Sequence, residues 1–366
     1  MRRFMRKLHL WLAVPFGVVV TLVCLSGAAL VFEDEITALC RPELYRVDAA
    51  GRQPLPVDRV VGGVQRTLPA GTGIAGVSIP ADPSAPWRVN LTQPRRAWVA
   101  VNPYTGEVLG RGGRLPFFSF MFRLHRWLLG EAGSVGKMVV GLSTLAFAAA
   151  LLTGLALWWP RRRGVLRHAL TVPVRRGLPR FWFGLHNAGG FYACLLLLVM
   201  ALTGLTWSFG WYRSAFYALF GTQPPQRHGA GGGPSARRDG AAPRPTDFAQ
   251  WQTVADELRR LHPHGGTISL KDGEATVALR ALGNSRATDR YAFDPATGRM
   301  ELVSRYADAP PADKLRGWIY SVHTGTWGGL VTRALYFLAA LLGATLPLTG
   351  YYLWWRRLRR RGRRAA

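Results

Sequence analysis

Four long apolar stretches constrain the fold of this chain more than any other feature. They lie at about Leu8 to Phe32, Gly136 to Trp159, Phe181 to Phe209 and Leu330 to Trp355. A helix needs about 20 predominantly apolar residues to cross the hydrocarbon core of a bilayer, and each stretch reaches that length. Their Gly, Ser and Thr residues suit close helix packing in lipid. The sequence therefore predicts four transmembrane helices.

The first span begins like a signal peptide, with basic residues at Arg2, Arg3, Arg6 and Lys7. Its apolar region is too long for a signal peptide, and no small-residue cleavage site precedes Glu33. We therefore expect an uncleaved membrane anchor.

Basic residues predict the orientation of the spans. Residues 1–7, 160–180 and 356–366 contain 4, 7 and 7 Lys or Arg and no acid, whereas all 20 Asp and Glu lie in or beside residues 33–135 and 210–329. Short basic segments stay in the cytoplasm, so we expect cytoplasmic termini and two long loops on the outer side of the membrane. The net charge of +27 then reflects arginines beside anionic lipid. Membrane lipid is thus an expected partner, and nucleic acid is not.

Two histidines stand at the same distance from a repeated tripeptide. His9 lies 18 residues before Gly27 of Leu-Ser-Gly, and His186 lies 18 before Gly204 of Leu-Thr-Gly. An imidazole within a span is costly unless it is paired or liganded, and both spans run outward, which gives the two histidines one depth. We expect His9 and His186 to be the axial ligands of one haem iron. The alternative is a pair of interfacial histidines bonded to water or headgroups.

His125 and His323 form a second predicted pair. They precede the spans that contain the other two tripeptides, ending at Gly154 and Gly350. An unbroken helix from either histidine to the tryptophans at the end of its span would extend nearly 50 Å at about 1.5 Å per residue, so we expect both at the outer interface. Intervening glycines allow a break before each span. We expect a second haem there; the alternative is two surface residues.

The remaining candidate ligands are weaker. The sequence predicts that His168, His262 and His264 are solvated and that His228 has no role. Cys24 and Cys194 lie in spans and Cys40 stands alone, with no C-x-x-C-H motif, so both haems (haem b) would be held non-covalently.

The two long loops are predicted to be small α+β domains of similar design. A turn of the form Asn/Asp-Pro-x-Thr-Gly occurs once in each, at 102–106 and 294–298; Pro fixes φ and Gly accepts a positive φ. The predicted elements are a helix at Val57 to Leu68 and strands at Trp87 to Leu91, Ala97 to Val101 and Glu107 to Leu109, then a helix at Phe248 to Leu261 and strands at Glu274 to Arg280 and Arg290 to Phe293. Between the third span and the second domain, Gly221 to Pro245 is predicted to be a flexible linker.

The chain is thus predicted to be an internal duplication of span, outer domain and span. The expected fold is an α-helical membrane protein, a bundle of four transmembrane helices with two small α+β periplasmic domains. The expected boundaries are 1–32 for the N-terminus and first span, 33–115 for the first domain, 116–160 for an interfacial segment and the second span, 161–180 for a basic cytoplasmic loop, 181–210 for the third span, 211–246 for an extension and linker, 247–315 for the second domain, and 316–366 for an interfacial segment, the fourth span and a basic tail.

Four local motifs give this chain a family resemblance. They are Arg-Lys-Leu-His9, Arg-Leu-His125-Arg-Trp, Gly-Leu-His186-Asn-x-x-Gly and Leu-Thr-Gly350-Tyr-Tyr-Leu-Trp-Trp-Arg. With its order of spans and domains, the chain resembles the PepSY-associated transmembrane helix family over nearly its whole length, and the loops would be PepSY-like domains. The resemblance implies a di-haem inner-membrane protein that reduces ferric siderophores from the periplasmic side.

The predicted function is electron transfer across the membrane to a periplasmic acceptor, a ferric siderophore, by a haem-dependent membrane reductase. No flavin or nicotinamide motif is found, so the electron donor would be a quinol or a separate cytoplasmic reductase. Two alternatives stand beside this prediction. The chain could be a non-enzymatic, membrane-anchored PepSY module that binds peptides or proteins, or a transporter with repeated halves. Its repeats are parallel and its spans carry no acid, which disfavours transport.

Overall fold

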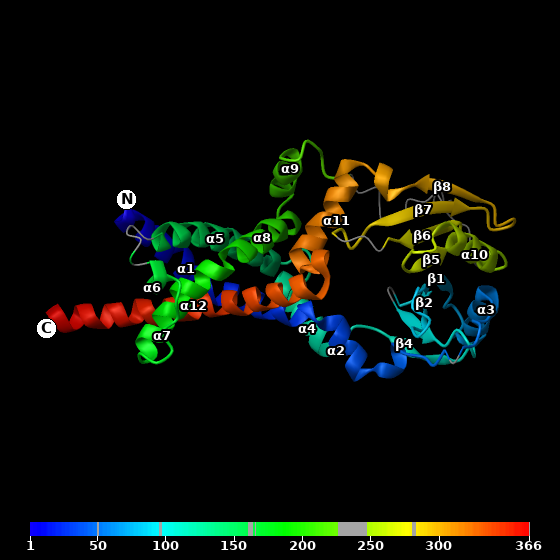
Figure 1. Cartoon of the computed structure of the whole chain (residues 1–366), viewed down its shortest axis with the longest axis horizontal. Coiled ribbons are helices and arrows are strands. Elements are labelled where there is room, and N and C mark those ends of the chain that lie inside the picture. Colours follow the sequence, from blue (N-terminus) through cyan, green and yellow to red (C-terminus); the bar gives the residue numbers. More distant parts are fainter. Residues whose placement is uncertain are drawn as a thin grey trace. The chain divides into compact units, whose positions relative to one another are not determined.

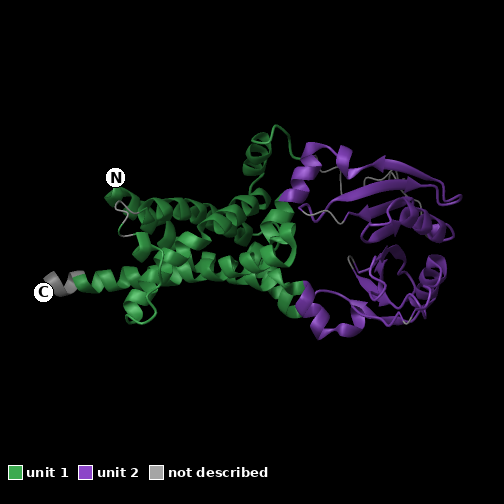
Figure 2. Ribbon diagram, in the orientation of Figure 1, with its two compact units in different colours: residues 1–33, 116–224, 319–366 green, residues 34–115, 225–318 purple. Residues whose placement is uncertain are grey.

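The computed structural model describes residues 1–49, 51–94, 97–159, 164, 166–225, 247–279 and 283–365. It divides into two compact units (Figure 2). Unit 1 contains residues 1–33, 116–224 and 319–366, and unit 2 contains residues 34–115 and 225–318. Most of the predicted linker at 221–245, with His228, lies outside the described residues.

Unit 1 is helical. Within the described residues, four helical segments are long and apolar enough to cross a membrane: Arg2–Val31, Val135–Trp158, Leu178–Ser208 and Thr326–Arg360. These confirm the four predicted spans. The helices of this part of the chain are α1 (Arg2–Val31), α4 (Pro116–Trp127), α5 (Val135–Trp158), α6 (Leu166–Ala169), α7 (Leu178–Gly184), the π-helical η3 (Leu185–Gly189), α8 (Gly190–Ser208), α9 (Gly210–Ala218), α11 (Pro311–Thr324), the short η5 (Thr326–Gly328) and α12 (Gly329–Ala365).

The four long helices form a bundle in which each packs on two neighbours (Figure 1). Helix α1 packs on α5 and α12, and α8 packs on the same two helices. Apolar residues between α5, α8 and α12, including Leu151, Leu197 and Ala339, form a buried cluster. Helices α1 and α8 therefore face each other across the bundle core, as do α5 and α12.

Both predicted breaks before the second and fourth spans are present. Helix α4 ends at Trp127, eight residues before α5 begins, and α11 ends at Thr324, five residues before α12 begins. The chain leaves α4 through Leu128 and Leu129, whose φ angles of 48° and 70° are unusual for residues with side chains, whereas Gly325 takes φ 73° after α11. Short turns thus separate His125 from the second span and His323 from the fourth span.

Unit 2 contains an antiparallel sheet of eight described strands in the order β4-β3-β2-β1-β5-β6-β7-β8. One helix and four strands come from each long loop. They are α3 (Val57–Thr67), β1 (Ile74–Ile79), β2 (Trp87–Leu91), β3 (Trp98–Val101) and β4 (Val108–Gly112), then α10 (Trp251–Leu261), β5 (Ile268–Lys271), β6 (Glu274–Ala278), β7 (Thr288–Phe293) and β8 (Met300–Ser304); α2 (Glu33–Cys40), η1 (Pro42–Leu44) and η4 (Tyr306–Asp308) are shorter.

The core of unit 2 lies on one face of this sheet. The buried valines of α3 and the buried Trp251, Val254 and Leu258 of α10 pack on inward-facing strand residues such as Val89 and Val277. Because side chains alternate along a strand, the other face presents polar residues of the same strands. Helices α3 and α10 cover the first face only.

The two predicted domains share this one sheet. Strands β1 and β5 pair antiparallel, with Ser78 opposite Ser269, so the β-strands from the two loops form one structure and not two. Unpaired edges at β1 and β5 would expose backbone groups, and their pairing removes both edges. Strands β1, β5 and β8 were not predicted, whereas the seven predicted helices and strands are present, with their described ends within three residues of the predicted ones.

The two matching turns are present as predicted. Gly106 and Gly298 have φ angles of 77° and 72°, and their amides donate to the carbonyls of Asn102 and Asp294 at 2.9 and 2.8 Å. One smaller prediction is wrong. His262 is not solvated, because its Nε2 lies 2.7 Å from the hydroxyl of Tyr291 and its side chain is only 16% exposed.

Candidate functional site

The structure brings the four predicted histidines together in two pairs, both in unit 1. The ring centroids of His9 and His186 lie 6.3 Å apart, with an angle of 84° between the ring planes. Those of His125 and His323 lie 6.1 Å apart at 57°. The first pair joins α1 with η3, the turn directly before α8, and the second joins α4 with α11. His168 and His264 are exposed and join neither pair.

Both separations fit two imidazoles that share one metal ion. An imidazole nitrogen lies about 2.0 Å from a bound first-row metal ion, which places the centroids of two rings on opposite sides of it about 6 Å apart. No group of three or more His, Cys, Asp and Glu that could hold a metal ion occurs in the described part of the chain. Two nitrogens alone suit a metal whose other ligands come from a macrocycle, and haem iron has that need.

The His9–His186 pair is oriented by hydrogen bonds at Nδ1. The Nδ1 of His9 lies 3.1 Å from the carbonyl of Ala150 and 3.1 Å from Oγ1 of Thr153. The Nδ1 of His186 lies 3.1 Å from the carbonyl of Leu346 and 2.9 Å from Oγ1 of Thr349. A carbonyl only accepts, so Nδ1 carries the proton and donates. The Nε2 atoms are left unprotonated, the form that binds a metal.

The His125–His323 pair is oriented in the same way. The Nδ1 of His125 donates to the carbonyl of Val23 at 2.9 Å, and that of His323 donates to the carbonyl of Met200 at 3.0 Å, with Oγ1 of Thr203 at 3.1 Å. Burial lowers the pKa of His125 and of His323, which lie outside the candidate spans. Both imidazoles are therefore neutral and keep a free Nε2.

Each histidine is held by a tripeptide on another helix. The accepting carbonyl always lies four residues before the tripeptide glycine, and that glycine faces the imidazole. Gly154 faces His9, Gly27 faces His125, Gly350 faces His186 and Gly204 faces His323. The histidine and the glycine that share a span, such as His9 and Gly27, thus serve different pairs. We infer that the tripeptides form the sockets in which the imidazoles sit.

The glycines provide the space that these sockets need. A methyl group added at Gly27 would lie 2.9 Å from Cε1 of His125, and one at Gly204 would lie 3.1 Å from Cε1 of His323. The corresponding distances are 3.3 Å from Gly154 to His9 and 3.6 Å from Gly350 to His186. The sockets of His125 and His323 are therefore tighter than those of His9 and His186.

The shared spacing of 18 residues has a geometric meaning. At 3.6 residues per turn, 18 residues are five turns, so His9 and Gly27 lie on the same face of α1. His186 has the same spacing to Gly204, beginning in the π-helical turn η3. Five turns rise about 27 Å, which separates the two pairs along the bundle by nearly the thickness of a hydrocarbon core of about 30 Å.

The family model for the PepSY-associated TM region matches residues 6–357. The chain belongs to this family. A search of curated proteins found no match to it. All four histidines and all four tripeptides of this PepSY-associated TM region lie within the matched residues.

Several residues of the candidate site in this PepSY-associated TM region were not predicted from the sequence. The hydroxyls of Thr153, Thr203 and Thr349 contact Nδ1 atoms, and Trp207 packs edge-on against His323 with centroids 5.1 Å apart. The recurrence of Thr before the glycine was the available signal. At the fourth tripeptide, the hydroxyl of Ser26 donates to the carbonyls of Leu22 and Val23 of its own helix.

Proposed function

We propose that this membrane protein is a di-haem electron carrier that reduces a periplasmic acceptor. Its single strongest support is the presence of two imidazole pairs, each with free Nε2 atoms at a separation suited to one iron. His9 and His186 would hold one haem b and His125 and His323 the other. Haem between two imidazoles supplies reversible one-electron exchange between ferric and ferrous iron.

Backbone carbonyls around the pairs fix the orientation of the ligands. Carbonyls of Ala150, Leu346, Val23 and Met200 hold the Nδ1 protons. The four histidines would hold the haem irons in pairs through Nε2, and the haems would supply electrons to the acceptor without binding it. The site consequently needs no nucleophile and no general acid or base, and the imidazoles act only as ligands.

The spacing of the pairs supports transfer across a bilayer. We propose that the His9–His186 pair lies on the cytoplasmic side of the inner membrane, beside the basic termini, and that the His125–His323 pair lies on the periplasmic side. The donor would be a quinol or a cytoplasmic reductase. The acceptor best suited to a membrane reductase of this kind is a ferric siderophore, in which iron(III) gains the electron and is released as iron(II).

We further propose that the chain arose by duplication. The order of a span, a helix with four strands and a second span occurs twice, and the socket exchange repeats with it: α1 exchanges with the α4–α5 segment as α8 exchanges with the α11–α12 segment. Each half would thus contribute one ligand to each haem, and neither half would bind haem alone.

Haem stoichiometry tests the proposal. The purified full-length protein should show a reducible low-spin spectrum with two haems per chain. His9→Ala and His186→Ala should each leave one haem and retain the same remaining spectrum, whereas His125→Ala and His323→Ala should each remove the other haem.

The exposed His168 provides a matched control, because His168→Ala should keep both haems. Absence of haem from the parent protein, or loss of the same haem in all four variants, would contradict the proposal. Haem-free protein that is folded would favour the anchored peptide-binding module.

A further inference from the structure

A pocket lies on the face of the unit 2 sheet opposite α3 and α10, and it contains an arginine that contacts two aromatic rings. Its volume is about 440 Å³, within the range of about 300–1,000 Å³ typical of small-molecule sites. It is lined by residues of η1, β1, β2 and β3 and by the loop before β5. The lining residues are Leu44, Tyr45, Ser78, Pro80, Ala85, Pro86, Arg88, Asn90, Trp98 and Thr267.

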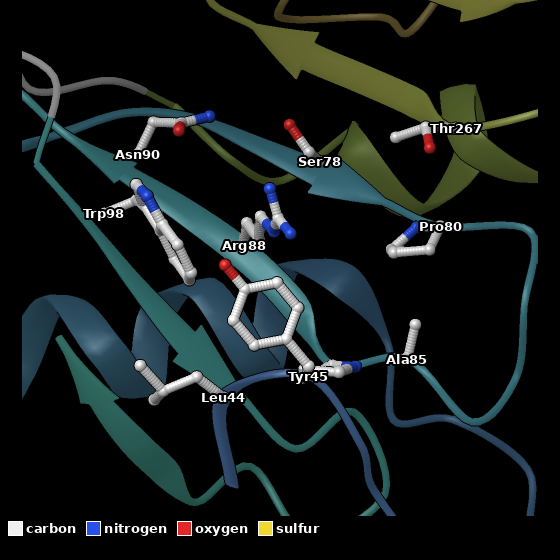
Figure 3. Close-up of a pocket in the computed structure, with 10 residues that line it drawn as sticks. Leu44, Tyr45, Ser78, Pro80, Ala85, Arg88, Asn90, Trp98 and Thr267 are labelled. Carbon is white, nitrogen blue, oxygen red and sulfur yellow. The ribbon is translucent and has the colours of Figure 1, made fainter. Parts of the chain in front are cut away.

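The guanidinium of Arg88 is fixed by stacking. It lies 4.7 Å from the centroid of a Trp98 ring and 5.3 Å from that of the Tyr45 ring, and Figure 3 shows Arg88 beside both side chains. Such cation–π contacts orient a guanidinium without using its N–H donors. The side chain therefore loses little further freedom when it binds an acceptor.

Those donors have no partner among the residues that the structure describes. Arg88 forms no ion pair and no side-chain hydrogen bond with any other residue that the structure describes. It is also the one charged residue among the described residues that line the pocket. A single planar cation with no acid among the described lining residues favours a ligand with one negative charge, and its fork of donors matches the two oxygens of a carboxylate.

The opposite wall of the pocket is apolar. Pro80, Ala85 and Pro86 line it, and Ser78 and Thr267 lie toward β5 (Figure 3). Proline rings and an alanine methyl offer a flat surface without hydrogen-bonding groups. A ligand that meets both walls combines a carboxylate with a flat apolar body.

Strands β6 and β7, which correspond to β2 and β3, pair in the same way without an Arg–Trp contact, so the fold does not require the contact between Arg88 and Trp98. Arg88 is paired with Ala100, two residues before the turn at Asn102, and Trp98 lies four residues before that turn. In the second half, Glu274 is paired with Ala292, two residues before Asp294, and Arg290 lies four residues before it. The same strand pairing thus forms with other residues at both positions.

From these observations we propose that the Arg88 pocket binds a small organic monocarboxylate with a flat apolar group, the carboxylate on the guanidinium and the apolar body against Pro80 and Pro86. The site uses none of the paired histidines, so the proposal does not depend on haem binding.

Calorimetric titration of the full-length protein in detergent tests this, with benzoate as the probe. Benzoate should bind, benzamide should bind about tenfold or more weakly because it lacks the charge, and acetate should bind more weakly because it lacks the ring. Arg88→Gln should reduce benzoate affinity about tenfold or more, and Arg88→Lys should recover only part of it, since Lys cannot form the two-pronged bond.

Arg290→Gln is the matched control, because Arg290 is an exposed arginine of β7 outside the pocket, and it should bind benzoate like the parent. Arg88 is exposed, so its variants should keep the parent circular dichroism spectrum and melting temperature. Failure of benzoate to bind the parent, or equal binding to parent and Arg88→Gln, would overturn the proposal. So would equal binding of benzoate and benzamide.

Discussion

Gly154 gives His9 the space in which its imidazole lies, since a methyl group on Gly154 would come within 3.3 Å of Cε1 of His9. The same relation joins Gly27 to His125, five turns along the helix that carries His9. Helix α1 therefore supports both histidine pairs, with a ligand at one end and a socket at the other, and the segment from η3 to α8 does the same with His186 and Gly204.

Alanine substitutions of the tripeptide glycines should have graded effects on ligand placement. Gly27→Ala places a methyl group 2.9 Å from Cε1 of His125, closer than real side-chain contacts, so the imidazole must shift within its socket. We expect haem affinity at the outer pair to fall about 10- to 100-fold, the range for lost support of a metal ligand. Gly350→Ala places a methyl group 3.6 Å from Cε1 of His186, so it should change haem affinity at the His9–His186 pair little. Spectroscopic haem titration measures both, and equal effects would contradict the ordering.

Replacing Thr153, a threonine of the His9 socket, should weaken haem binding by His9. Thr153→Val keeps the shape of the side chain but removes the hydroxyl 3.1 Å from Nδ1 of His9. Because the Ala150 carbonyl remains, we expect the loss in haem affinity to be about tenfold or less. Ser26→Ala is the control, since the Ser26 hydroxyl bonds to its own helix. A larger loss in Ser26→Ala than in Thr153→Val would refute this role.

The two pairs should differ in their electron paramagnetic resonance spectra. The angle between axial imidazole planes governs the g-anisotropy of low-spin ferric haem, and the planes meet at 84° in the His9–His186 pair and 57° in the His125–His323 pair. The inner pair should give the more anisotropic signal. His125→Ala should remove the less anisotropic signal and leave the other; loss of the opposite signal would show that the assignment is reversed.

Trp251 should be the most sensitive position of α10 for the stability of unit 2. Its side chain is fully buried in the core that α3 and α10 form with the sheet. Truncation of a buried Trp to Ala costs about 3–5 kcal/mol, so Trp251→Ala should sharply increase hydrogen exchange in α10, β5 and β6 of the full-length protein. Leu261→Ala, at a position 46% exposed, should leave exchange near the parent rate.

The spans and histidine pairing followed from local patterns, but the sockets did not. Length and hydropathy identify a span without reference to its neighbours, and a repeated spacing relates His9 to His186. The partner of each imidazole depends on which helices pack together, and the sequence associated Gly27 with His9 when the structure places it against His125. That exchange is a property of packing.

The sheet shows the same limit. Strands with alternating burial, such as Trp87–Leu91, were recognisable from their residues alone. Strand β5 has four residues after a Gly-Gly pair, which is too short to show a period. Its pairing with β1 joins residues far apart in the chain, and no local signal predicts it.

The five turns between His9 and Gly27 link membrane thickness to the positions of the ligands. A one-residue insertion between them would rotate one end of α1 by about 100° relative to the other, turning either the imidazole or the socket away from its partner and damaging sites on both sides at once. Relatives adapted to thicker or thinner bilayers would therefore have to change this segment by near-whole turns, and by equal amounts in both halves of the chain.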